Sequence, residues 1–71
     1  MQVNEIIETL RSHADMEVSL SEIDPMVCQI INMINPSLET IKISMSQYAG
    51  ISYLEYRNPE CGIIYTSVAL L

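Results

Sequence analysis

The feature that most constrains the fold is a change in the spacing of apolar residues near the middle of the chain. Before Pro36 these residues recur at helical spacing, and from Leu38 onward they alternate with polar residues at the period of two that is typical of a strand. Because a residue that precedes proline is disfavoured in the helical region, the helical part is expected to end at Asn35. The sequence therefore predicts helices followed by strands, which is an α+β arrangement.

Two helices are expected in the N-terminal half. Residues 3–14 place their apolar side chains along one helical face. Residues 25–34 follow Asp24, a good N-cap, and begin with Pro25, whose missing N–H would have had no partner in the first turn. The second helix is apolar around most of its circumference, which indicates burial on more than one side. Between the helices, residues 16–20 alternate and are expected to form a short edge strand or an extended connector, with the strand favoured.

Three strands joined by short turns are expected in the C-terminal half, in the order 38–46, turn at Ala49-Gly50, 51–57, turn at 58–62, and 63–70. Short turns join neighbouring strands in the antiparallel sense, so these strands would form a meander. The predicted fold is one small domain over residues 1–71. It has two N-terminal helices packed on one face of a three-stranded antiparallel meander, with residues 16–20 as the candidate extra edge strand.

Negative charge is concentrated near the N-terminus. The first 24 residues hold six acidic side chains against one arginine, a formal charge of −5 out of a total of −6. This balance repels nucleic acid and anionic membranes and steers the chain toward basic protein surfaces. Three basic residues in the whole chain cannot neutralise a phosphate backbone. The expected partner is therefore a basic protein surface, with no direct binding of nucleic acid or membrane.

No group of residues predicts catalysis, a cofactor or a metal site. His13 is the only histidine and is expected to be a solvated residue at a helix end. Cys28 and Cys61 lack the neighbouring ligands of a zinc site and are expected to be free thiols. The N-terminus shows no signal peptide, and no apolar run approaches the roughly 20 residues of a membrane-spanning helix. We therefore expect a non-enzymatic protein of the cytoplasm.

The apolar content is high for so short a chain, at 49% of residues with a mean hydropathy of +0.25. A domain of 71 residues has little core in which to hide that surface, so self-association or an obligate partner is expected. Helix 25–34 and the last strand, which is apolar on both faces, are the expected contact elements. One predicted function is accordingly a structural or regulatory homo-oligomer, for example a homodimer, with these two elements at the subunit interface.

In size and acidity the chain is similar to small phage- or plasmid-encoded inhibitors, immunity proteins and nucleic-acid mimics. The similarity is in keeping with the first predicted function, to which the homo-oligomer is the alternative: a protein-binding module that acts as an inhibitor or decoy and competes with nucleic acid for a basic surface. Acidic side chains would steer the encounter, and tyrosines, which are enriched at binding hot spots, would anchor it. The expected partner-binding residues are Glu5, Glu8, Glu17, Glu22, Asp24, Tyr53 and Tyr56.

Overall fold

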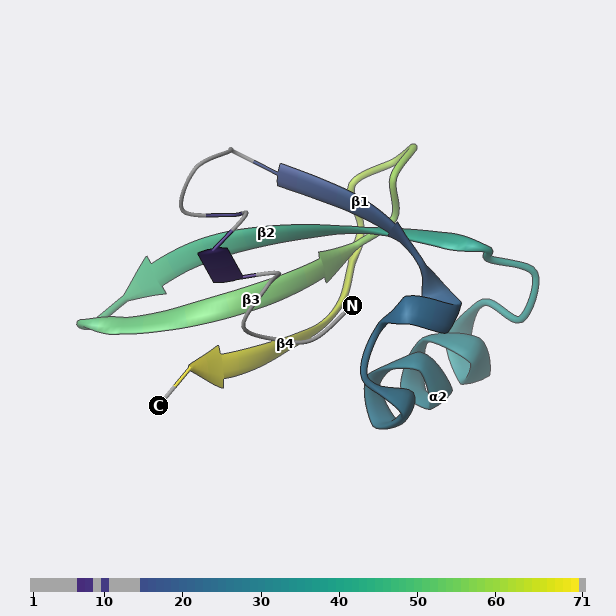
Figure 1. The fold of residues 1–71 in the computed structure, drawn as a ribbon, viewed down its shortest axis with the longest axis horizontal. Coiled ribbons are helices and arrows are strands. Elements are labelled where there is room, and N and C mark those ends of the chain that lie inside the picture. The colour runs from purple at the N-terminus through teal and green to yellow at the C-terminus, as the bar shows by residue number, and fades with distance from the viewer. Residues whose placement is uncertain (1–6, 9, 11–14, 71) are drawn as a thin grey trace.

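A four-stranded antiparallel sheet with one α-helix on one face forms the fold (Figure 1). The structure is a computed structural model and describes residues 7, 8, 10 and 15–70. Its elements are β1 (Asp15–Ser19), the 3-10 helix η1 (Leu20–Glu22), α2 (Pro25–Ile34), β2 (Thr40–Tyr48), β3 (Ile51–Arg57) and β4 (Ile64–Leu70). The strand order is β1-β2-β3-β4, and each neighbouring pair is antiparallel.

The prediction of two helices on a three-stranded meander is wrong, because the described residues contain one α-helix, a 3-10 turn and four strands. The stretch at 16–20 is a full member of the sheet that runs from Asp15 to Ser19 and pairs with β2 along its whole length. Met16 and Val18 lie opposite Ile43 and Ile41, so their apolar sides match on one face. Of the expected helix at 3–14, Ile7, Glu8 and Leu10 are helical, and its other residues lie outside the described part.

The helix expected at 25–34 is confirmed as α2, and its ends follow local chemistry. The Asp24 carboxylate accepts a hydrogen bond of 2.8 Å from the backbone N–H of Met26, and Pro25 occupies the first helical position. At the other end Asn35 donates its backbone N–H to the Ile31 carbonyl, and Pro36 follows. Within the described residues, no helix has the length and apolar character needed to cross a membrane.

The turn expected at Ala49-Gly50 is confirmed and joins β2 to β3 as a two-residue loop. Both loop residues have positive φ, 53° at Ala49 and 78° at Gly50, and Tyr48 pairs directly with Ile51. Two consecutive left-handed residues are the type I′ geometry, whose twist matches that of the flanking strands. The hairpin thereby fixes the register that places Ile43 beside Tyr56 and Met45 beside Leu54.

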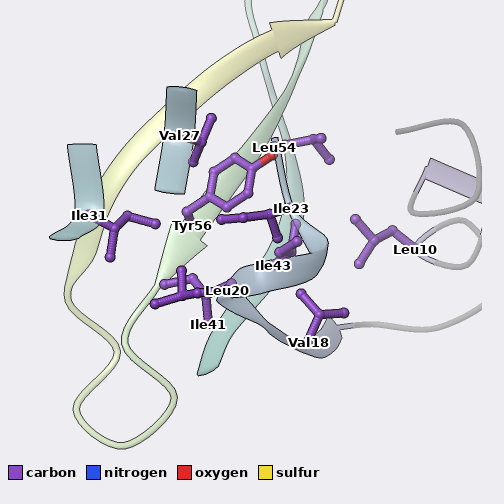
Figure 2. Packing of buried hydrophobic residues seen from close by; sticks show 10 residues of the cluster. All are labelled: Leu10, Val18, Leu20, Ile23, Val27, Ile31, Ile41, Ile43, Leu54 and Tyr56. Atoms are coloured by element: carbon purple, nitrogen blue, oxygen red, sulfur yellow. The ribbon is translucent and has the colours of Figure 1, made fainter. Parts of the chain in front are cut away.

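The core lies on one face of the sheet, under α2 and η1. Ile31, Ile41, Ile43 and Leu54 are fully buried. Figure 2 shows the cluster between α2, η1 and the sheet, with Leu10 at its margin. The opposite face is formed by the alternate residues of each strand, which in β2 are polar, among them Lys42 and Ser44. This second face has no covering element among the described residues, and we refer to it as the open face.

The last strand is an edge strand rather than a central one. A register shift separates the pairs Tyr56–Thr66 and Arg57–Ile64, so Tyr65 is an extra residue with no partner on β3. The shift turns Tyr65 toward the core side. Its hydroxyl accepts hydrogen bonds from the amides of Asn35 at 3.1 Å and Asn58 at 2.9 Å. The start of β4 is thus tied to the C-terminal end of α2.

Candidate functional site

Four acidic residues follow one another along β1, η1 and the cap of α2, and all four are exposed. We call Asp15, Glu17, Glu22 and Asp24 the acidic flank. Glu17, Glu22 and Asp24 are among the partner-binding residues expected from the sequence. Glu8 is also exposed, whereas Glu5 lies outside the described residues.

Most of the acidic flank also has a role inside the fold. The Asp15 carboxylate lies 3.6 Å from the Lys42 ammonium, and Glu17 accepts a hydrogen bond of 3.3 Å from the Thr40 hydroxyl. Asp24 caps α2 as described above. The ion pair is more than one-third exposed at both ends, so solvent screens it and its net contribution to stability is small. The acidic flank therefore still presents negative charge to the solvent, although three of its four residues also have contacts within the chain.

The two tyrosines expected to anchor a partner lie on opposite faces of β3. Tyr56 is 3% exposed and packs in the core, where burial raises the pKa of its phenol above the usual value and the nearby Asp24 carboxylate adds to the rise. Tyr53 is half-buried on the open face, opposite Ser46 and Ala69. Of the pair, only Tyr53 is placed where a partner could reach it.

The two described basic residues, Lys42 and Arg57, are cross-strand neighbours on the open face. Each has an acidic neighbour: Asp15 for Lys42, and Glu55, whose carboxylate accepts a 2.9 Å hydrogen bond from the Arg57 guanidinium. A polar hollow of about 590 Å³ lies here and extends to the turn before β4. Because both signs of charge are paired within it, this surface offers no net attraction to an anion.

A second hollow, of about 450 Å³, lies between η1 and α2 and is lined mainly by apolar atoms. Leu20 and Ile23 form one side, and Cys28 and Asn32 of α2 form the other. The Cys28 thiol accepts a long hydrogen bond of 3.5 Å from the Asn32 amide. Cys28 and Cys61 are both free thiols, as expected from the sequence. The hollow is a shallow groove on the η1 side of α2.

Exposed apolar side chains also lie around α2 and along β4. We call Met26, Ile30, Met33, Ile34, Ile64 and Val68 the apolar flank, all of which are large hydrophobic residues in contact with solvent. Met33 also lines the groove beside η1, and Ile64 lies opposite Arg57 on the open face. Their exposed fractions reach 72% at Met26 and 80% at Met33, and apolar side chains exposed next to one another are typical of an interaction surface.

The two parts of the apolar flank are adjacent because α2 lies between η1 and β4, in contact with both. Cys28 and Asn32 face η1, where they line the groove with Leu20. A helix turns by about 100° per residue, so Ile30 and Ile34 lie on the side of α2 away from Cys28. That side is turned toward β4. Ile30 and Ile34 of helix 25–34 and Val68 of the last strand thus lie on the same side of the sheet. From the sequence, these two elements are expected to form a subunit interface together.

Sequence reasoning missed Tyr65, Asn35 and Asn58, whose side chains meet although up to 30 residues separate them. The side-chain Oδ1 of Asn58 also accepts hydrogen bonds from the backbone N–H groups of Glu60 and Cys61, which shapes the turn before β4. The Asn-Pro turn signal was visible in the sequence, but the bulge that directs Tyr65 toward α2 was not. Comparison of the chain with protein-family models, curated proteins and solved structures finds no match.

Proposed function

We propose that this chain is a non-enzymatic interaction protein that works by self-association through its apolar flank. The observation that carries the proposal is the exposure of β4. This edge strand has no charged residue and no proline, four of its seven residues are exposed, and it lies beside the exposed apolar side of α2. An exposed, uncharged edge strand is a template for pairing with another strand. A partner surface would remove the apolar flank from water, which is the main driving force of association.

The charge of the chain favours this location for a contact between copies. A net charge of −6 makes two copies repel each other, yet Asp15 and Glu17 lie on β1, at the far edge of the sheet from β4. Contact through β4 therefore brings the least charged edge of one copy to the least charged edge of the other. The protein is expected to work in the cytoplasm, where Cys28 and Cys61 remain reduced.

The test is the solution mass of the full chain, measured by size-exclusion chromatography with light scattering over a range of protein concentrations and at low and high salt. The expected result is a mass about twice the 8.0 kDa of one chain. The dimer should persist or strengthen at high salt, because salt screens the mutual repulsion and leaves apolar burial intact. A chain that stays monomeric at every concentration and salt would overturn the proposal.

A second candidate function is favoured by the exposure of the acidic flank. In this proposal the chain acts as an inhibitor or decoy that docks on a basic protein surface, steered by Glu17, Glu22 and their neighbours, with Tyr53 as an accessible anchor. The two candidates use different surfaces, so an assembled dimer would still present two acidic flanks to a basic partner.

Binding to a poly-lysine peptide, followed by calorimetry at low and high salt, tests this second candidate. The double variant Glu17→Lys/Glu22→Lys should bind more weakly than the matched variant Glu39→Lys/Glu60→Lys, which changes the net charge equally at exposed positions elsewhere. Equal weakening by both variants would show that binding follows net charge alone, and that the flank is not a docking site.

A further inference from the structure

We infer that two copies of the chain join by antiparallel pairing of β4 with β4, centred at Ser67, to form a continuous eight-stranded sheet. This inference rests on the proposed self-association and adds how the copies meet. On β4 alternate residues direct their backbone N–H and C=O groups away from β3, toward the edge. A second β4 offers the same row of donors and acceptors in the opposite direction, so a two-fold axis through the edge satisfies both rows at once.

The pattern of side chains restricts the register. Val68 lies on the core side, opposite Leu54, and Ser67 lies on the open face, opposite Glu55. A two-fold axis perpendicular to the sheet keeps each side chain on its own face, so residues of like orientation must oppose each other. The register centred at Ser67 overlaps the two strands along their full length and meets this condition at the centre, where Val68 lies opposite Thr66 of the second copy, both on the core side. Toward the ends the bulge at Tyr65 interrupts the alternation, so the condition applies to the three central residues.

In this register the exposed side of α2, which lies next to β4, also takes part in the contact between copies. The Tyr65 hydroxyl, held by Asn35 and Asn58, fixes the C-terminal end of α2 over the start of β4. In the paired sheet, the start of one β4 lies beside the end of the other. Ile34, which is 58% exposed, is then brought toward Leu70 of the second copy. The strand supplies backbone hydrogen bonds, while α2 supplies apolar area toward the roughly 800 Å² per copy that a stable contact buries.

The charges of the two copies stay apart in this arrangement. The two β1 strands become the outer edges of an eight-stranded sheet, separated by seven strand spacings or about 34 Å. That distance exceeds the Debye length of about 8 Å at physiological ionic strength, so the acidic residues Asp15 and Glu17 of one copy hardly repel those of the other. β4 itself has no charged side chain and so adds no charge to the contact between copies.

Disulfide cross-linking in a Cys28→Ala/Cys61→Ser background tests the register directly. The residue on the two-fold axis lies opposite the same residue of the second copy, within disulfide reach. The residues on either side of it lie too far from their own counterparts in an antiparallel pair. We therefore compare Thr66→Cys, Ser67→Cys and Val68→Cys under mild oxidation. Ser67→Cys should form covalent dimer roughly tenfold faster than the other two. Glu17→Cys on β1, the matched position on the other edge, should form none.

The outcomes separate this inference from the function on which it rests. A dimer that cross-links through Met33→Cys and at none of the three β4 positions would overturn β4 pairing and leave self-association standing. Equal cross-linking at all three β4 positions would indicate parallel strands and would also overturn the inference, as would a maximum at Thr66→Cys or Val68→Cys. A monomeric mass at all concentrations would overturn both the inference and the proposed function.

Discussion

The two edges of the sheet are built differently, although both belong to the same four strands. β1 is five residues long and alternates acidic or polar residues with Met16 and Val18, of which Val18 is buried. β4 is seven residues long, has no charge and buries none of its residues. Charged side chains on an edge strand discourage the addition of another strand, and an uncharged edge invites it. The contrast supports the proposal that a second copy adds its strand at β4 and not at β1.

The two edges also differ in what holds them. β1 is tied to the core by apolar pairs with β2, and its acidic residues contact Lys42 and Thr40 on the open face. β4 pairs with β3 along its length and is held to the core by Tyr65, whose hydroxyl meets Asn35 and Asn58, and by a half-buried Leu70. Both edges therefore contribute to the single chain, but only β4 leaves an uncharged edge with exposed apolar side chains.

The largest expected effect comes from breaking the core beneath β1. Ile41 is fully buried opposite Val18, so Ile41→Ala should lower the free energy of unfolding by about 2–5 kcal/mol, from lost apolar burial and the cavity left behind. Urea denaturation measures this loss of unfolding free energy, at a protein concentration low enough to keep the chain monomeric. Val68→Ala on β4 is the comparison and should cost less than about 1 kcal/mol, because Val68 is 38% exposed. Equal losses would show that β4 is as much part of the core as β1.

A charge placed on β4 should act on assembly rather than on stability. Val68→Lys gives β4 the kind of side chain that protects β1, and should weaken the dimer by roughly tenfold or more, about 1.4 kcal/mol. Sedimentation equilibrium measures the dissociation constant. The matched control is Tyr48→Lys, which makes the same change at an exposed apolar residue at the tip of the β2–β3 hairpin. Because both variants lower the net charge from −6 to −5, repulsion between whole molecules falls equally in the two. If the control weakened the dimer as much as Val68→Lys, the loss would not depend on β4, and β4 would have no special part.

The third prediction separates the structural role of one acidic residue from the charge of its neighbours. Asp24→Ala removes the N-cap of α2 and should destabilise the chain by about 1 kcal/mol. Glu22→Ala removes an equal charge two residues earlier, at an exposed position that caps no helix, and should change stability by less than about 0.5 kcal/mol. Thermal unfolding compares the two, and Asp24→Asn should recover most of the loss. Equal destabilisation by both alanine variants would attribute the effect to charge and not to capping.

The parts of the fold that sequence could predict are those whose determinants lie close together in the chain. The ends of α2 follow from Asp24, Pro25 and the Asn35-Pro36 step, and the hairpin follows from Ala49-Gly50 between two alternating stretches. The sheet of four strands could not be predicted in the same way. β1 becomes a strand by pairing with β2 more than 20 residues away, a contact that five alternating residues do not specify by themselves.

The candidate surfaces were predictable in composition but not in arrangement. Strand alternation places Tyr53 and Tyr56 on opposite faces, yet only the packing of α2 and η1 decides that the face of Tyr56 is covered. An apolar pattern on both faces suits a buried central strand as well as an exposed edge, so the position of β4 required the whole sheet order. The bulge at Tyr65 has no signal in local spacing, because it depends on contacts with Asn35 and Asn58.

The smallest expected effect on stability gives the sharpest test of the contrast between the edges. Asp15→Ser/Glu17→Ser removes both charges from β1 and breaks only the exposed contacts to Lys42 and Thr40, so the free energy of unfolding should change by less than about 0.5 kcal/mol. If those charges serve to keep β1 from pairing, the same variant should form species larger than a dimer, because both edges are then open to another strand. Light scattering of this variant, beside the charge-matched control Glu39→Ser/Glu60→Ser, measures the effect. A variant that stayed dimeric would show that charge is not what protects β1, and that its short length or its pairing to the core is enough.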